Sequence, residues 1–246
     1  MTLTFANFKL GVENSWPPYA DASGEGISKE LVLSAYKHVG LSPEIRAYPY
    51  SRVLNLVTTG EIVGGFNVTR QESTVEKFIF GKESLFKAHA SIYYGSPHEY
   101  KSLKELPIGF KMGVIRGYEY GDKFEKEKSR FNIVRVNTQE QLLQMVARKR
   151  IEGAILFDLV KDYTVNSAKM TESKFFKGFH NHTSSIFVAF SRKEPRAKFY
   201  AEKLDEGLRL IRKNGEYNKI FQRHRSLLFS ELDFIEENLV VGFQRK

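Results

Sequence analysis

Apolar and polar residues alternate along the first 70 positions with two different periods. Three stretches have the short, apolar-rich pattern of β-strands, and turn-forming residues mark their ends. These predicted strands are residues 8–12, 43–48 and 61–68. Apolar residues between them recur at helical spacing. The order is therefore strand, helix, strand, helix, strand, which is typical of a mostly parallel sheet covered by helices.

The two intervening helices have recognisable ends. In residues 27–40 the apolar side chains fall on one helical face, with Ser28 predicted as the N-cap and Gly40 as the C-terminal stop. The second helix is predicted from Ser51 to a stop at Gly60.

The same order recurs further along the chain. Strands are predicted at 111–115, 131–136 and 152–157, and helices at 119–128 and 138–150. Thr138 and Gln141 predict a capping box at the start of the last helix. Two such units predict an α/β protein of two lobes, each a mostly parallel sheet flanked by helices.

Two strand-like stretches, 87–95 and 184–192, flank the second unit, and an amphipathic helix is predicted at 195–215. The economical path leaves lobe 1 through the first strand and returns through the second. Lobe 1 is then discontinuous (1–90 and 188–246), and lobe 2 comprises 91–187. Two crossing strands make a hinge, and we expect a ligand site in the cleft between the lobes.

Composition narrows the function classes. The net charge is +9, but Lys and Arg are spread along the chain, often beside Glu, which indicates a solvated basic surface rather than a nucleic-acid site. There is no cysteine for disulfide or thiol chemistry. No apolar run approaches the roughly 20 residues that span a bilayer. The N-terminus enters a strand almost at once, which fits either a mature exported protein or a cytoplasmic one.

Ligands of open parallel sheets bind beyond the carboxyl ends of the strands. The stretch GVENSWPPYAD (11–21) leaves the first strand, breaks on two prolines, and carries Trp16, the only tryptophan, with Tyr19 and Glu13. We expect these aromatics to line the cleft, with core plugging as the alternative. The same rule selects Thr69, Arg70, Arg116, Gly117, Tyr118 and Asp158.

Four stretches in this order resemble a known family. SWPPYADASGEGISKELVLSAYKHVG and YPYSRVLNLVTTGEIVGGFNVTRQESTVEKFIFGKESLF are similar to the first lobe of the bacterial extracellular solute-binding proteins of family 3. LPIGFKMGVIRGYEYGDKF is similar to the start of their second lobe, and FVAFSRKEPRAKFYAEKLDEGLRLIRKNGEYNKIFQRH to their return strand and C-terminal helices. The resemblance covers roughly residues 8 to 225. It implies the two-lobed fold of the type 2 periplasmic binding proteins, best known as amino-acid receptors of ABC transporters.

The resemblance also implies ligand contacts. Glu13 and Trp16 match an acid and an aromatic that the family offers after its first strand, and Tyr50 matches a position that packs on the ligand. Asn67 and Thr69 match polar residues after the third strand. In lobe 2 the matching loop is Gly117, Tyr118 and Glu119. Asp158 is the candidate for an acid that binds the ligand's α-ammonium.

The chain departs from the family at Thr74. Amino-acid-binding members have there an arginine that clamps the ligand's α-carboxylate, and a neutral hydroxyl cannot replace that charged fork. Arg70, Arg52 or Arg116 are the candidates to take its place. The structural alternatives are a pair between Arg70 and Glu72, and an Arg52 that is solvated or pairs with a neighbouring acid.

Three function classes are compatible with these features. The first is a periplasmic, monomeric solute-binding protein, with its signal peptide removed, which captures an amino acid or related carboxylate by hinge closure and delivers it to the membrane permease of an ABC transporter. The second is a ligand-sensing domain of a signalling receptor. The third is an enzyme on the same fold, for which Glu13 is the only obvious acid–base group. The tail after residue 226 continues past the family's last helix.

We favour the first class, a binding protein and not an enzyme. HNH at 180–182 lacks a nearby third ligand and is predicted as a loop rather than a metal site. The sequence has no phosphate loop, dinucleotide fingerprint or nucleophile elbow. No cofactor or metal is therefore expected.

Overall fold

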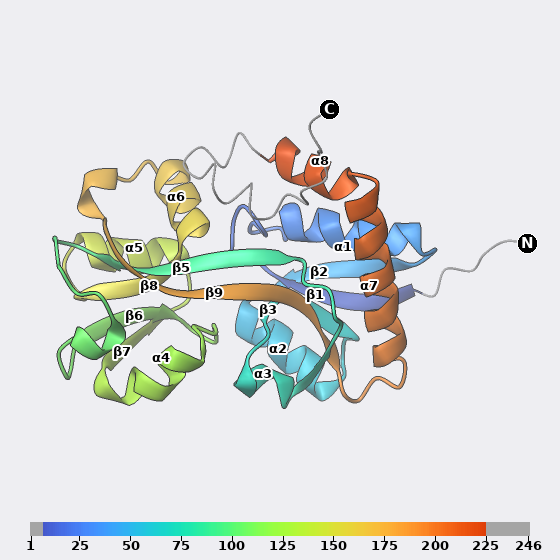
Figure 1. Ribbon diagram of the computed structural model, residues 1–246, viewed down its shortest axis with the longest axis horizontal. Helices are drawn as coiled ribbons and strands as arrows, with labels where there is room; N and C mark the ends of the chain where they lie inside the picture. Colours follow the sequence, from blue (N-terminus) through green and yellow to red (C-terminus); the bar gives the residue numbers. More distant parts are fainter. Residues whose placement is uncertain (1–6, 225–246) are drawn as a thin grey trace, which may run out of the picture. The chain divides into compact units, whose positions relative to one another are not determined.

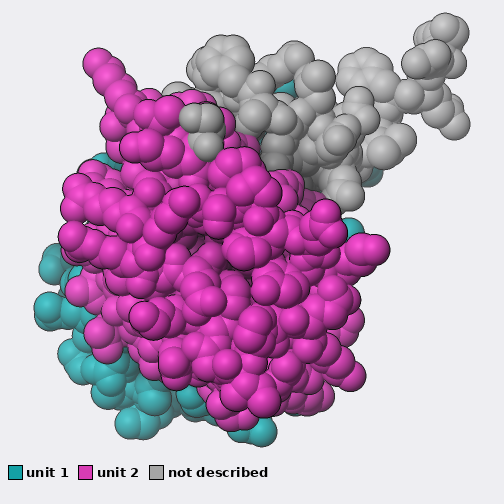
Figure 2. Space-filling view, turned by 90° about the vertical axis from the view of Figure 1, so that its left-hand side faces the viewer, with its two compact units in different colours: residues 1–14, 18–87, 185–246 teal, residues 15–17, 88–184 magenta. Residues whose placement is uncertain are grey.

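The computed structural model describes residues 7–224 (Figure 1). The tail after residue 226 lies outside this range. The described chain forms two compact units (Figure 2). Unit 1 comprises residues 7–14, 18–87 and 185–224, and unit 2 comprises residues 15–17 and 88–184. The chain passes from unit 1 to unit 2 inside strand β5 (Phe86–Tyr94) and returns inside strand β9 (Phe176–Ser191).

The sheet of unit 1 is mostly parallel, as predicted. Strand β1 (Asn7–Glu13) lies between β2 (Ser42–Tyr48) and β3 (Gly64–Thr69) and is parallel to both. The C-terminal part of β9 pairs antiparallel with β3 and with the short β4 (Phe78–Phe80). Every residue of β3 is buried, as expected for a strand inside a sheet covered on both faces.

Helices cover this sheet, and α1 and α2 lie on opposite sides of the strands in Figure 1. The helices of unit 1 are α1 (Ile27–His38), α2 (Tyr50–Thr59), α3 (Glu72–Val75), α7 (Ala197–Lys213) and α8 (Glu216–Arg223). Helix α7 packs closely on α1 at Gly207, where an added Cβ would lie 2.0 Å from the carbonyl oxygen of Ala35. This close approach requires glycine.

Unit 2 repeats the architecture with its own mostly parallel strands, which belong to the same nine-stranded sheet as those of unit 1. Strand β6 (Lys111–Ile115) is parallel to β7 (Asn132–Val136) and to β8 (Gly153–Phe157), and β8 pairs antiparallel with β5. Its helices are α4 (Asp122–Glu127), α5 (Gln139–Ala147) and α6 (Asp158–Ser167), with 3₁₀ turns η1 (Leu103–Glu105), η2 (Lys128–Arg130) and η3 (Glu172–Lys174). Leu142, Leu143 and Val146 of α5 are fully buried in the core of this unit.

The structure corrects two predicted caps. Helix α1 begins after Gly26, and Ser28 makes no capping bond, because the N–H groups of Ile27 and Ser28 already donate to the carbonyls of Pro18 and Tyr19. At α5, Thr138 accepts from the Gln141 N–H (3.2 Å) as predicted. However, the Gln141 side chain accepts from the Asn137 N–H instead of the Thr138 N–H.

The loop predicted for HNH at 180–182 is wrong, because these residues lie inside β9. The predicted strand started at residue 184, whereas β9 starts at Phe176. Residues 176–183 are exposed or half-buried and mostly polar, so they lack the apolar pattern that marks a buried strand. Helix α6 was not predicted either, and it starts directly at the end of β8 without a loop.

Candidate functional site

Three candidate residues of unit 1 lie at ends of neighbouring elements. Glu13 is the last residue of β1, Thr69 the last residue of β3, and Tyr50 the first residue of α2, which follows β2. Because the three strands are parallel neighbours, their carboxyl ends share one edge of the sheet. All three side chains are buried, with exposed fractions of 2% for Glu13, 5% for Thr69 and 6% for Tyr50.

Asn67 is the most unusual residue of this edge. It has φ 70, in the left-handed region, and lies where the pairing of β3 with β9 shifts register between Phe66 and Val68. The residue is only 4% exposed, yet neither Nδ2 nor Oδ1 has a hydrogen-bond partner within residues 7–224. A strained backbone and an unpaired buried amide each cost on the order of 1–3 kcal/mol. Such a combination is a mark of functional sites.

Thr74, the position where the family's arginine was expected, has a structural role. Its hydroxyl donates to the carbonyl of Thr69 (2.7 Å) and accepts from the N–H of Gln71 (3.0 Å), in a capping box that starts α3. The residue is 3% exposed. Thr74 therefore shapes the turn after β3.

The three candidate arginines are all exposed. The Arg70 guanidinium lies 3.5 Å from the carbonyl of Gly81 and 5.7 Å from the ring centre of Phe187. No acidic residue within 7–224 pairs with it, so the suggested Arg70–Glu72 ion pair is not formed. Arg52 lies 5.5 Å from the ring centre of Tyr48.

The two aromatics of the GVENSWPPYAD loop have different surroundings. Tyr19 is fully buried in unit 1 and stacks on Phe86 at 4.3 Å, so it is part of the core of that unit. Trp16 belongs to unit 2 and packs edge-on against Phe157 at 4.9 Å, with 1% exposure.

Phe157 joins several candidates of unit 2. Tyr118 lies 6.4 Å from the Phe157 ring, and its hydroxyl donates to the carbonyl of Ser15 (3.4 Å). His182 lies 5.7 Å from the same ring. This aromatic group brings Trp16 and Tyr118 together, although they are about 100 residues apart in the sequence. Phe157 and His182 were not among the residues selected from the sequence.

The other residues of the loop after β6 are Arg116, Gly117 and Glu119. The Arg116 Nε donates to Oδ1 of Asn137 (3.3 Å), which holds the side chain against the loop after β7. Gly117 has φ 85, a conformation that glycine adopts without strain. Glu119 is buried, with 9% exposure.

His182 is a neutral imidazole in this environment. Burial, together with the charges of His180 and His89, lowers its pKa from 6.5 to about 4. Its Nδ1 accepts from Nδ2 of Asn181 (2.8 Å), and Nε2 has no hydrogen-bond partner in the part of the chain that the structure describes.

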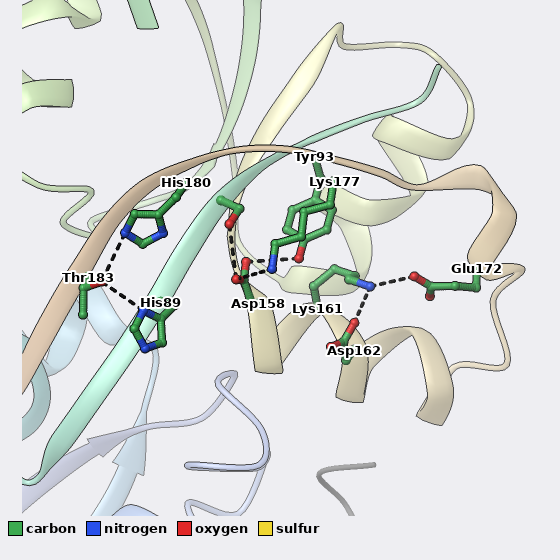
Figure 3. Close-up of polar contacts among 10 residues, drawn as sticks. His89, Tyr93, Asp158, Lys161, Asp162, Glu172, Lys177, His180 and Thr183 are labelled. Atoms are coloured by element: carbon green, nitrogen blue, oxygen red, sulfur yellow. Dashed lines mark hydrogen bonds and ion pairs between the residues drawn. The ribbon is translucent and has the colours of Figure 1, made fainter. Parts of the chain in front are cut away.

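Asp158 follows Phe157 at the start of α6 and has partners inside unit 2 (Figure 3). Its Oδ1 accepts from the Tyr93 hydroxyl (3.0 Å), and its Oδ2 accepts from the Ser91 hydroxyl (3.2 Å). The Lys177 ammonium lies 2.8 Å from Oδ2. The buried carboxylate is thus neutralised by a lysine of the same chain.

Beside this network lies Lys161, with only 4% exposure. Its ammonium pairs with Asp162 and with Glu172 (2.7 Å) and lies 5.2 Å from the ring centre of Tyr93 (Figure 3). Burial alone would lower the pKa of Lys161, but the hydrogen bonds to the two carboxylates outweigh it and raise the pKa. These contacts hold Tyr93, and through it Asp158, in place.

The Lys177–Asp158 pair is open to a direct test. Lys177→Met should destabilise the protein by about 1 kcal/mol, because the lysine is half-exposed but its partner is buried. Urea unfolding of wild type, both single variants and Lys177→Met/Asp158→Asn gives the coupling energy between them. Lys174→Met, at a second exposed lysine of unit 2, should change little. A coupling near zero would contradict the pairing.

Within residues 7–224 no group of three or more His, Cys, Asp or Glu side chains is placed to hold a metal ion. The helices in that range also lack the length and apolar character needed to cross a membrane.

The chain was compared with known proteins. No family model and no curated protein matches it. Solved structures do match. One is a histidine kinase sensor domain with similarity to periplasmic binding proteins (18% identity, 89% of this chain and 96% of that one, TM-score 0.76). Another is an ancestral arginine-binding protein bound to arginine (18% identity, 88% of this chain and 97% of that one, TM-score 0.73). A third is an amino acid ABC transporter substrate-binding protein from Streptococcus pneumoniae bound to L-arginine (15% identity, 92% of this chain and 97% of that one, TM-score 0.73).

These similarities define the class of fold. The chain has the two-lobed α/β fold of the type 2 periplasmic binding proteins, as the sequence resemblance implied. At 15–18% sequence identity these matches show the fold of the chain but do not identify its ligand.

Proposed function

We propose that this protein binds a small polar solute, an amino acid or related carboxylate, and delivers it to the permease of an ABC transporter from the periplasm. Residues of both units contact the solute, and hinge closure selects the bound state. The chemistry is binding without turnover. The observation that carries the proposal is Asn67, whose buried amide has unused hydrogen-bonding groups and which lies two positions before the candidate residue Thr69.

A buried amide without partners is unfavourable in a folded protein, and a polar ligand that accepts from Nδ2 and donates to Oδ1 removes that penalty on binding. The positive φ of Asn67 fixes the direction of its Cα–Cβ bond before the ligand arrives, which lowers the entropy lost on binding.

The charges favour a carboxylate over an ammonium as the ligand's recognised group. Lys177 already neutralises Asp158, the acid that the resemblance assigned to an α-ammonium. Arg70, Arg52 and Arg116 are exposed cations that can receive a carboxylate in bidentate fashion. A ligand with a carboxylate and a neutral polar group therefore fits the exposed arginines and the amide of Asn67.

The similarity to a histidine kinase sensor domain supports the second candidate, a ligand-sensing domain. Both candidates need the same solute site and differ in what the closed form contacts. Reconstituted transport with candidate permeases tests delivery. A sensor would bind the solute with the same affinity but support no transport.

A thermal-shift screen of amino acids, carboxylic acids and their amides tests solute binding. Ligand at about 100 times Kd stabilises the folded state by about 2.7 kcal/mol. The intrinsic fluorescence of Trp16, the only tryptophan, gives an independent readout. A complete absence of stabilising compounds among polar solutes would contradict the proposal.

Asn67→Gly separates binding from folding. Glycine tolerates φ 70 and removes the unpaired amide, so the variant should be at least as stable as wild type in urea unfolding. Affinity for the compound found in the screen should fall about tenfold or more, the loss of about 1–3 kcal/mol for a buried hydrogen bond.

The matched control is Lys149→Gly, which relieves another positive φ (53) at an exposed residue outside the candidate site. It should leave affinity unchanged. If Asn67→Gly binds as tightly as wild type, Asn67 is a structural residue and the assignment of the site is wrong.

A further inference from the structure

Unit 2 contains a pocket of about 450 Å³ that none of the candidate solute-binding residues lines. Its walls are the segment 101–104, helix α4 and residues 179–181 of β9. Small-molecule sites are concave and typically of about 300–1,000 Å³, so this pocket has the size of a ligand site.

The lining is strongly basic. Lys101 and Lys104 lie on the segment 101–104, and Lys123 and Lys126 lie on α4. The acid in the lining is Glu127, and it is already paired with Arg130 at 3.0 Å. Within residues 7–224, Lys101, Lys104 and Lys123 form no ion pair. By contrast, Lys128 and Lys161 of the same unit pair with carboxylates.

Arg130 also holds the wall in shape. Its guanidinium donates to the carbonyls of Leu103 (3.2 Å), Lys104 (3.0 Å) and Leu106 (3.1 Å). These bonds fix the 3₁₀ turn that carries Lys104, while the bond to Glu127 ties that turn to the end of α4. The two lysine-bearing walls are therefore held in a fixed relation by one side chain, which preorganises the pocket.

We propose that this pocket binds a small anion carrying three or more negative charges, such as a polyphosphate or polycarboxylate group. Like charges that line one concavity repel each other, and a bound multivalent anion attracts all of them. The concave shape favours a compact ion over a flat macromolecular surface. This site is additional to the proposed solute site and does not depend on it.

The probe is sodium tripolyphosphate, titrated by calorimetry in about 0.15 M salt, where exposed charges beyond roughly 8 Å are screened. Wild type should bind it saturably with one ion per chain, and more weakly as salt rises. Lys104→Glu/Lys123→Glu should weaken binding at least about tenfold. If the charge-reversed variant fails to fold, Lys101→Gln/Lys104→Gln/Lys123→Gln takes its place. This variant removes the three charges without reversing them, and it should also weaken tripolyphosphate binding.

The matched control is Lys198→Glu/Lys219→Glu, which makes the same charge change at two exposed lysines of unit 1. Lys198, like Lys123, is the second residue of its helix. The control should bind tripolyphosphate within about twofold of wild type. An equal loss in both variants would overturn the proposal in favour of a general effect of net charge.

Two further arms separate other sources of anion binding. Arg70→Ala should leave tripolyphosphate binding unchanged. If this variant no longer binds tripolyphosphate, the anion binds at the proposed solute site and not in this pocket. Anionic phospholipid vesicles should not bind, or should be displaced by tripolyphosphate. Vesicle binding that needs the pocket lysines and resists tripolyphosphate would replace the small-anion proposal by a membrane surface. If wild type does not bind tripolyphosphate saturably, the small-anion proposal is also overturned.

Discussion

Lowering the pH from 6.5 to 4 should remove about 3 kcal/mol of folding stability through His182 alone. Its pKa is about 4 in the folded protein, because burial and the charges of His180 and His89 oppose protonation, against 6.5 for an unperturbed histidine. As the pH falls below 6.5 the unfolded chain takes up a proton that the folded chain refuses, which favours unfolding. The contribution is fully present above pH 6.5 and is lost progressively down to about pH 4.

The neighbours of His182 suggest the replacement. His182 contacts the rings of Phe157 (5.7 Å) and Tyr120 (6.4 Å), so His182→Phe keeps an aromatic ring there and removes the titration. Asn181 keeps a partner in the variant, because its Nδ2 also donates to the carbonyl of Tyr120 (2.9 Å). His180 and His89 share the Thr183 hydroxyl and remain unchanged.

Urea unfolding of wild type and His182→Phe at several pH values between 4 and 7.5 measures the effect. The stability difference between them should grow in favour of the variant as the pH falls through this window. His98→Phe, at an exposed histidine of the same unit, is the control and should follow the wild-type curve. Parallel curves for wild type and His182→Phe would show that His182 is protonated as easily when folded as when unfolded.

Much of the fold could be predicted because its signals are local. Strand β6 was predicted with its observed ends, and Gly60 does end α2 with φ 82. Glycine and proline next to periodic apolar residues fix such boundaries. The N-terminal half of β9 carries no such signal, since its side chains are largely exposed and polar.

The candidate site was harder to predict from the sequence, because its chemistry depends on non-local contacts. Asn67 was selected from a resemblance, but nothing in the sequence GGFNVT indicates its positive φ or its unpaired amide. Lys177 lies 19 positions after Asp158, and only the fold brings its ammonium to that carboxylate. No local pattern in the sequence indicates a pairing of this kind.

Thr74, where the sequence departs from the family it resembles, has a structural role in the turn after β3. The hydroxyl that stands where the resemblance implies an arginine caps α3 and accepts from the N–H of Gln71. Under the proposed function, the cation that meets the ligand's carboxylate must come from another residue of the same edge. Arg70 is adjacent to Thr69 at the end of β3, and the Arg70 N–H donates to the carbonyl of Ser185 (3.4 Å), which fixes its backbone.

Arg70→Ala should therefore weaken binding of a carboxylate ligand by about 2 to 5 kcal/mol, the range for truncating one partner of a buried charge pair. The guanidinium makes a long contact with Gly81 and lies over Phe187, so little is lost from the folded protein when it is removed. Calorimetry of wild type and Arg70→Ala, each against the carboxylate found by screening and its primary amide, measures the effect.

The amide separates charge recognition from shape. Wild type should prefer the carboxylate, and Arg70→Ala should bind carboxylate and amide alike, because a neutral amide gains nothing from a guanidinium fork. Arg46→Ala is the matched control in unit 1, at an exposed arginine that pairs with Glu44 and is not a candidate for the clamp, and it should leave the preference intact. Equal affinity of wild type for both compounds would remove Arg70 as the clamp. The ligand would then be an uncharged solute, held by groups such as the amide of Asn67.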